Sequence, residues 1–230
     1  MIKVQSKGFT LIELLITISI LSALIFTGTF SYQMLANRWQ EEVGTYNKTL
    51  ANSKGISLLS RILHGVAPYI IIDERENKRP GLLFVGNENK LFGVTQQGLF
   101  SGKYPEIFRL TLEQQENKKY NLIYQSVSTK NQSIFTTQQE IAFEHNYLLL
   151  ENIDELVFSY RGWDNLPSMS IQKEAQEQPK VTNEYSGINK QLLPLNIMTT
   201  LTINSETMMI EVDSGRDSLQ HTTLYLGNNS

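Results

Sequence analysis

The chain has 230 residues, of which 40% are hydrophobic and 19% charged, so it holds enough apolar material for a packed core and lacks the composition of a disordered chain. The formal net charge of −3 gives no indication of a nucleic-acid partner. With no cysteine, the chain has no disulfide framework, no thiol nucleophile and no thiolate metal site.

The amino terminus places a short basic stretch before a long apolar run. Lys3 and Lys7 precede the run, which covers residues 14–30 and approaches the length of about 20 residues that crosses a bilayer as a helix. Basic flanks stay in the cytoplasm, so the rest of the chain is expected to be exported. No helix breaker follows before Pro68, and the sequence therefore predicts one long helix from Phe9 to about Gly65.

The second half of that helix carries apolar residues at helical spacings, which predicts one face packed on a globular domain. These residues are Ile56, Leu59, Ile62, Leu63 and Val66.

After Pro68 the sequence consists of short runs of strand-forming residues separated by turn formers. Strands are expected at residues 69–73, 82–85, 91–95, 107–112, 120–127, 140–143, 147–150, 153–160, 195–203, 207–212 and 222–226, with a hairpin around residues 204–206. A helix followed by strands predicts an α+β fold with a mostly antiparallel sheet. Residues 163–193 are mostly polar and rich in turn formers, and we expect an exposed loop there.

The segment KGFTLIELL holds one acid, Glu13, inside the apolar run. A charged side chain at membrane depth costs a few kcal/mol on insertion scales, so Glu13 needs a partner. The segment resembles the class III signal of type IV prepilins and pseudopilins. The resemblance implies that a prepilin peptidase cuts after Gly8 and that Phe9 becomes an N-methylated amino terminus. It also implies that Glu13, the fifth mature residue, pairs with the amine of a neighbouring subunit during assembly. In a monomeric helix Glu13 would instead lie one turn from Phe9, within reach of the α-amine of its own chain.

This resemblance implies a division of the chain into a cleaved leader (1–8), a transmembrane and assembly half of the helix (9–30), an amphipathic half (31–67) and a globular domain (68–230). The implied location is the inner membrane, crossed once, with the amino terminus cytoplasmic and the globular domain periplasmic or extracellular. After assembly the protein would lie in a filament.

A second resemblance covers the carboxy-terminal half. The segments LLLENIDELVFSYRGWDN and LPLNIMTTLTI are similar to J-type minor pseudopilins of type II secretion systems, through Leu150, Glu151, Leu156, Phe158, Trp163, Leu193 and Pro194. W-type minor pilins and minor prepilins of mannose-sensitive pili share the same architecture, and the sequence leaves these alternatives open. The implied partners are other minor and major pseudopilins or pilins, the prepilin peptidase and methylase, the inner membrane and secreted cargo.

No catalytic or metal-binding motif is visible. The histidines His64, His145 and His221 have no metal-ligand spacing, and the SxxK match at Ser170–Lys173 lacks its companion motifs. The acidic segment 213–217 is interpreted as a polar turn and not as a Ca²⁺ site, because it lacks a downstream bidentate acid. We therefore expect a filament subunit without cofactor. The alternative of a membrane-anchored envelope enzyme or binding protein would need clustered catalytic groups.

Overall fold

The computed structural model describes residues 10–74, 79–164 and 178–214, within two units that meet between Ala51 and Asn52. Helix α1 (Leu11–His64) contributes to both units. In the first unit its large apolar side chains are exposed, and Leu11–Gln40 is long and apolar enough to cross a membrane. The expectation of a long helix is confirmed, with a candidate span that extends ten residues beyond the expected end at residue 30.

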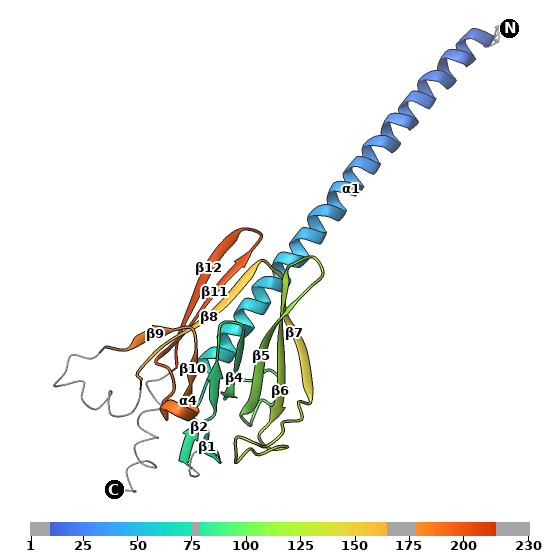
Figure 1. Ribbon diagram of the computed structural model, residues 1–230. Coiled ribbons are helices and arrows are strands. Elements are labelled where there is room, and N and C mark those ends of the chain that lie inside the picture. The colour runs from blue at the N-terminus through green and yellow to red at the C-terminus, as the bar shows by residue number, and fades with distance from the viewer. Residues whose placement is uncertain (1–9, 75–78, 165–177, 215–230) are drawn as a thin grey trace, which may run out of the picture. The chain divides into compact units, whose positions relative to one another are not determined.

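The second unit contains two larger antiparallel sheets and one small one (Figure 1). The six-stranded sheet has the order β10-β3-β4-β5-β6-β7, with β3 (Phe84–Gly86), β4 (Lys90–Thr95), β5 (Glu106–Gln114), β6 (Tyr120–Ser128), β7 (His145–Ile153) and β10 (Tyr185–Ser186). The four-stranded sheet has the order β12-β11-β8-β9, with β8 (Glu155–Gly162), β9 (Lys180–Thr182), β11 (Asn196–Ile203) and β12 (Glu206–Asp213). Strands β1 (Ile70–Asp73) and β2 (Arg79–Leu82) form a separate pair, and α4 (Gly187–Lys190) follows β10. The expected α+β class is confirmed.

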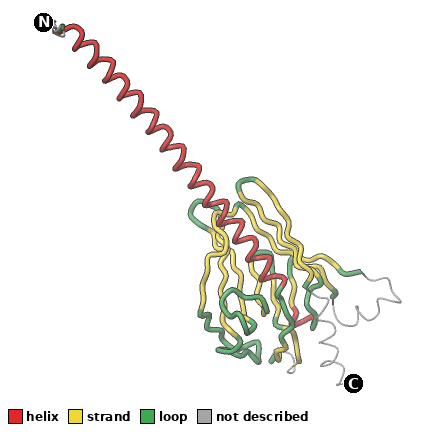
Figure 2. Tube along the Cα trace, turned by 180° about the vertical axis from the view of Figure 1, so that it is seen from behind, coloured by secondary structure: helices red, strands yellow, loops and turns green. Residues whose placement is uncertain are grey.

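The carboxy-terminal end of α1 and both larger sheets share one apolar core. Leu59, Ile62 and Leu63 have no exposed surface, and they belong to the same buried cluster as Phe108 of β5 and Phe158 of β8. Figure 2 shows this end of the helix among the strands of both sheets. The expected apolar face of the helix is therefore confirmed, and its burial stabilises the domain.

Gly55 brings α1 unusually close to β7. A Cβ atom at this position would overlap the carbonyl oxygen of Leu149 and the side chain of Leu150. The helix can approach the strand this closely only because residue 55 has no side chain.

The outer face of the six-stranded sheet carries a second apolar cluster. Its buried members are Ile71, Leu83, Val94, Ile107, Val127 and Ile134. The expected strand at residues 140–143 is wrong, because this segment covers the sheet without forming a ladder. The side chain of Gln132 holds it instead, donating to the carbonyl of Glu140 at 2.7 Å and accepting from the amide of Ala142 at 3.0 Å.

The expectation of an exposed loop over residues 163–193 is also wrong for its described ends. Trp163 is only 6% exposed, β9 pairs with β8, and β10 pairs with β3. Tyr185, Leu192 and Leu193 are buried in the domain. A few apolar side chains thus anchor a mostly polar stretch. Residues 165–177 and the expected strand at 222–226 lie outside the described residues.

Candidate functional site

The start of α1 holds Glu13 in a set of reciprocal hydrogen bonds with Thr10. The Thr10 amide donates to Glu13 Oε2 at 3.0 Å, and the Thr10 hydroxyl donates to the same oxygen at 2.9 Å. The Glu13 amide in turn donates to Thr10 Oγ1 at 3.4 Å. This is a capping box, in which the residue before the helix and the third helical residue satisfy each other's free amides. Glu13 therefore has a local structural role at the helix start.

The arrangement leaves the carboxylate able to receive a further donor. Both described bonds to the side chain fall on Oε2, and an ionised carboxylate has about four acceptor positions over its two oxygens. Gly8 and Phe9 lie outside the described residues, so the expected cleavage position has no structural description here. Phe9 directly precedes Thr10, and an amine created at Phe9 would lie one residue from the group that Glu13 already binds.

Several hydroxyl groups in the apolar part of α1 are satisfied inside the helix. Four of them donate to backbone carbonyls one turn earlier, at 2.6–2.8 Å: Thr17 to Leu14, Ser19 to Leu15, Thr27 to Ala23 and Thr29 to Ile25. Because these groups need no water, the helix surface can enter a bilayer or a bundle of helices at little polar cost. Its exposed leucine and isoleucine side chains form no core within their own unit.

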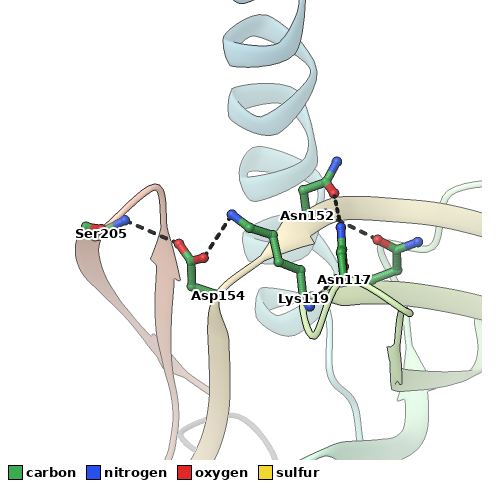
Figure 3. Close-up of polar contacts among 6 residues, drawn as sticks. Asn117, Lys119, Asn152, Asp154 and Ser205 are labelled. Carbon is green, nitrogen blue, oxygen red and sulfur yellow. Dashed lines mark hydrogen bonds and ion pairs between the residues drawn. The ribbon is translucent and has the colours of Figure 1, made fainter.

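A polar cluster lies where the two larger sheets join (Figure 3). Lys119 Nζ lies 2.9 Å from Asp154 Oδ1, and the Ser205 amide donates to Asp154 Oδ2 at 3.2 Å. The Asn117 side chain donates to the side-chain oxygen of Asn152 at 3.4 Å. The Lys119 ammonium, and then the Ser205 amide, lower the pKa of the Asp154 carboxyl below its ordinary value. The cluster links three connections: the one between β5 and β6, the one between β7 and β8, and the one between β11 and β12. Its role is therefore structural.

Glu106 is a buried acid that holds a loop at the edge of the domain. Its side chain accepts from the Tyr124 hydroxyl at 2.6 Å, from the Phe100 amide at 2.6 Å and from the Ser101 amide. Burial acts to raise the pKa of this carboxyl, but these hydrogen bonds outweigh it and hold the pKa below its ordinary value. The carboxylate is thus ionised and fully engaged by the protein, which is typical of a structural acid.

The two described histidines, His64 and His145, lie on different elements, α1 and β7. His64 lies on an exposed part of α1 and contacts the Ser60 carbonyl at 2.8 Å, while His145 stacks on Phe100 with ring centroids 4.2 Å apart. His221 and the SxxK match at Ser170–Lys173 lie outside the described residues, as do residues 215–217 of the acidic segment. Among the residues that the structure describes, no three His, Asp or Glu side chains are grouped closely enough to hold a metal ion.

Two residues with local structural roles, Thr10 and Glu106, were not predicted from the sequence. Thr10 is identifiable from the spacing Thr-x-x-Glu immediately before an apolar run, which is the sequence signature of a capping box. Glu106 has no comparable signal, because a single acid at the start of a strand is typical of an exposed strand end.

The comparison with family models gives one match. Residues 4–28 match the prokaryotic N-terminal methylation motif, a range that contains Thr10, Glu13 and most of the apolar run. No curated protein matches the chain. The motif is followed by an apolar helix of membrane-spanning length and an antiparallel β domain, an arrangement that is similar to that of type IV prepilins.

Proposed function

We propose that this chain is a minor subunit of a type IV-like filament. The observation that carries the proposal is Glu13, held by a capping box at the start of an exposed apolar helix within the N-terminal methylation motif. Cleavage after Gly8 by a prepilin peptidase would create an amine on Phe9, which is then N-methylated. Glu13 would receive the amine of a neighbouring subunit while it keeps its bonds to Thr10.

Filament assembly also accounts for the apolar surface of the helix. Side chains along Leu11–Gln40 form no core of their own, and helices of neighbouring subunits would cover them after they leave the membrane. The subunit would begin in the inner membrane with its amino terminus cytoplasmic and its β domain exported. Its work would then lie in interfaces with other subunits, without a catalytic site.

Within this class, we favour a J-like minor pseudopilin in the tip or initiation complex of a type II secretion pseudopilus. Support comes from the resemblance of residues 148–165 and 193–203 to that group. Several residues that carry the resemblance, including Leu150, Phe158 and Trp163, are buried. They therefore support a similar core more than a particular partner, and a minor pilin of a type IV or mannose-sensitive pilus is the alternative.

The charge pair is tested by substituting Glu13. Glu13→Val should leave the β domain folded, because the acid belongs to the other unit, yet it should strongly reduce incorporation into filaments. Thr10→Val should reduce incorporation less, and Thr10→Ser should restore it, because the hydroxyl that orients Glu13 is kept. Filament fractions would be quantified with an antibody to the β domain. Normal incorporation of Glu13→Val would remove the proposed role.

Processing is tested by the intact mass of the mature chain from membranes. The mass should correspond to a chain that begins at Phe9 with one added methyl group, and an uncut chain that begins at Met1 would contradict the proposal. Crosslinking in cells separates the two systems. Secretion pseudopilins as partners would support the J-like assignment, pilus components would support the alternative, and no prepilin-like partner would contradict both.

A further inference from the structure

Strand β12 forms the edge of the four-stranded sheet and presents a regular backbone edge. It pairs with β11 along its whole length, Glu206–Asp213, without a shift in register. In the described part of the chain, β11 is the only strand paired with it. Its eight residues exceed the usual strand length of about five or six residues.

The hairpin turn determines which amides face outwards. Asn204 and Ser205 form a two-residue turn with φ values of 51° and 67°, so the flanking residues Ile203 and Glu206 make a hydrogen-bonded pair. Hydrogen-bonded and non-bonded pairs then alternate along the ladder. Two contacts agree with this alternation. The Ser214 amide donates to the Leu195 carbonyl at 2.9 Å, as expected for a hydrogen-bonded pair. The Thr202 and Thr207 hydroxyls lie 3.0 Å apart across a non-bonded pair.

It follows that Thr207, Met209 and Glu211 direct their amides and carbonyls away from β11, towards the outer edge. The same three residues have exposed side chains, and Met209 is 67% exposed. The alternate residues Met208, Ile210 and Val212 direct their amides and carbonyls towards β11, and Val212 is buried in the core. The edge therefore offers evenly spaced backbone donors and acceptors, beside an exposed methionine.

Proteins usually block such an edge with lysine, proline or a bulge. Strand β12 has none of these, and its charged residues are all acidic: Glu206, Glu211 and Asp213. A second copy of the chain added at this edge would place two acidic strands side by side, which is unfavourable. A strand with basic side chains would instead meet opposite charges.

We propose that β12 receives a β-strand from a different polypeptide, which extends the four-stranded sheet at this edge. The incoming strand carries Lys or Arg opposite Glu211 and an apolar side chain opposite Met209. Backbone hydrogen bonds supply the affinity and these side chains supply the specificity. Methionine suits such a contact because its flexible side chain adapts to the surface that it meets.

The first test is amide hydrogen exchange of the isolated full chain in detergent. The amides of Thr207, Met209 and Glu211 should exchange rapidly, and those of Met208 and Ile210, which face β11, should be slower by about a hundredfold or more. Slow exchange at all five positions would show that another part of the same chain, such as residues 215–230, covers the edge, and would overturn the proposal.

The second test uses the full chain in cells, with p-benzoyl-phenylalanine in place of Thr207 as a photocrosslinker. The proposal expects crosslinks to an extended segment of another protein that contains Lys or Arg. Met209→Pro should lower the crosslink yield by about tenfold or more, because it removes one outward amide without breaking a bond to β11. Met209→Thr, the matched control, removes the same side chain but keeps the amide and should retain most of the yield.

Glu211→Lys should also lower the yield, because it reverses the charge that the incoming strand meets. Thermal unfolding of each variant checks that the domain remains folded. Equal yields from Met209→Pro and Met209→Thr, or crosslinks only to a second copy, would overturn the proposal. Filament assembly that depends on Glu13 would still stand in that case, so failure here is distinguishable from failure of the proposed function.

Discussion

The buried carboxylate of Glu106 gives the sharpest prediction about the stability of the β domain. Glu106→Gln keeps the shape of the side chain but removes its charge. One oxygen accepts from the Phe100 and Ser101 amides, and the other accepts from the Tyr124 hydroxyl at 2.6 Å and the Leu99 amide at 3.3 Å. In glutamine, the second oxygen becomes an NH₂ group that cannot accept a hydrogen bond from the Leu99 amide.

The expected cost follows from these contacts. Hydrogen bonds to a charged group contribute about 1.5–3 kcal/mol each, against about 0.5–1.5 kcal/mol for neutral pairs. Weakening the two bonds to the first oxygen and disrupting those to the second should lower the free energy of unfolding by about 3 kcal/mol. For a chain of this size, that corresponds to a fall in melting temperature of about 6–12 °C. Urea or thermal unfolding of the full chain in detergent measures this change.

The effect of pH distinguishes lost charge from altered packing. Because the pKa of Glu106 is lower in the folded protein than in the unfolded chain, its stabilisation is present above the unfolded pKa of about 4.3 and is lost as the pH falls through the folded pKa. The stability difference between wild type and Glu106→Gln should thus be constant near neutral pH and become smaller in acid. Glu113→Gln, an exposed acid on the same strand, serves as the control and should change stability by less than about 0.5 kcal/mol. A difference that stays the same from pH 7 to pH 3 would refute the reasoning.

Two further substitutions test the packing of α1 and the hairpin turn. Gly55→Ala should lower the free energy of unfolding of the β domain by about 3 kcal/mol, because the new Cβ overlaps the Leu149 carbonyl. Gly44→Ala, which has open space around it, should not lower it, and equal effects of the two variants in urea unfolding would contradict this account. Asn204→Val should cost about 1–2 kcal/mol by the same measurement, because residue 204 has a positive φ, whereas Asn204→Gly should be nearly neutral. A valine variant as stable as the glycine variant would show that the turn has another conformation in solution.

The parts of the fold that were predictable from sequence are those in which apolar residues recur at the regular spacing of a helix or a strand. The apolar face of α1 repeats at helical spacing, and β11 and β12 are regular strands joined by two turn residues, so their positions follow from the sequence. The strand β2 was missed because Pro80 and Gly81 lie inside it, and both residues are unusual within strands.

The errors between residues 129 and 193 have a different cause. The stretch after residue 177 is mostly polar, and its strands form by pairing with strands from other parts of the chain. Strand β10 pairs with β3, and β9 pairs with β8. Conversely, residues 140–143 alternate like a strand, but Ile141 and Phe143 pack against the sheet while the side chain of Gln132 binds the backbone of the segment. Local pattern cannot distinguish an apolar segment that joins a ladder from one that only covers it.

At the amino terminus, the motif was recognised from the sequence, but the hydrogen bonds between Thr10 and Glu13 were not predicted. Glu13 was expected to need a partner, and the sequence suggested an amine. The structure shows that Thr10 supplies two donors within the same chain. The role of Thr10 is that of a helix cap, and the spacing Thr-x-x-Glu indicates such a cap once the start of the helix is known.

The junction at Asp154 has a consequence for how the domain unfolds. This single residue separates β7, in one sheet, from β8, in the other, and Asn152, two residues earlier, has a left-handed φ of 55°. With so short a connection and a common core, neither sheet can open without disturbing the other. The β domain should therefore unfold in one cooperative transition, with the slowest-exchanging amides of both sheets reporting the same global opening free energy.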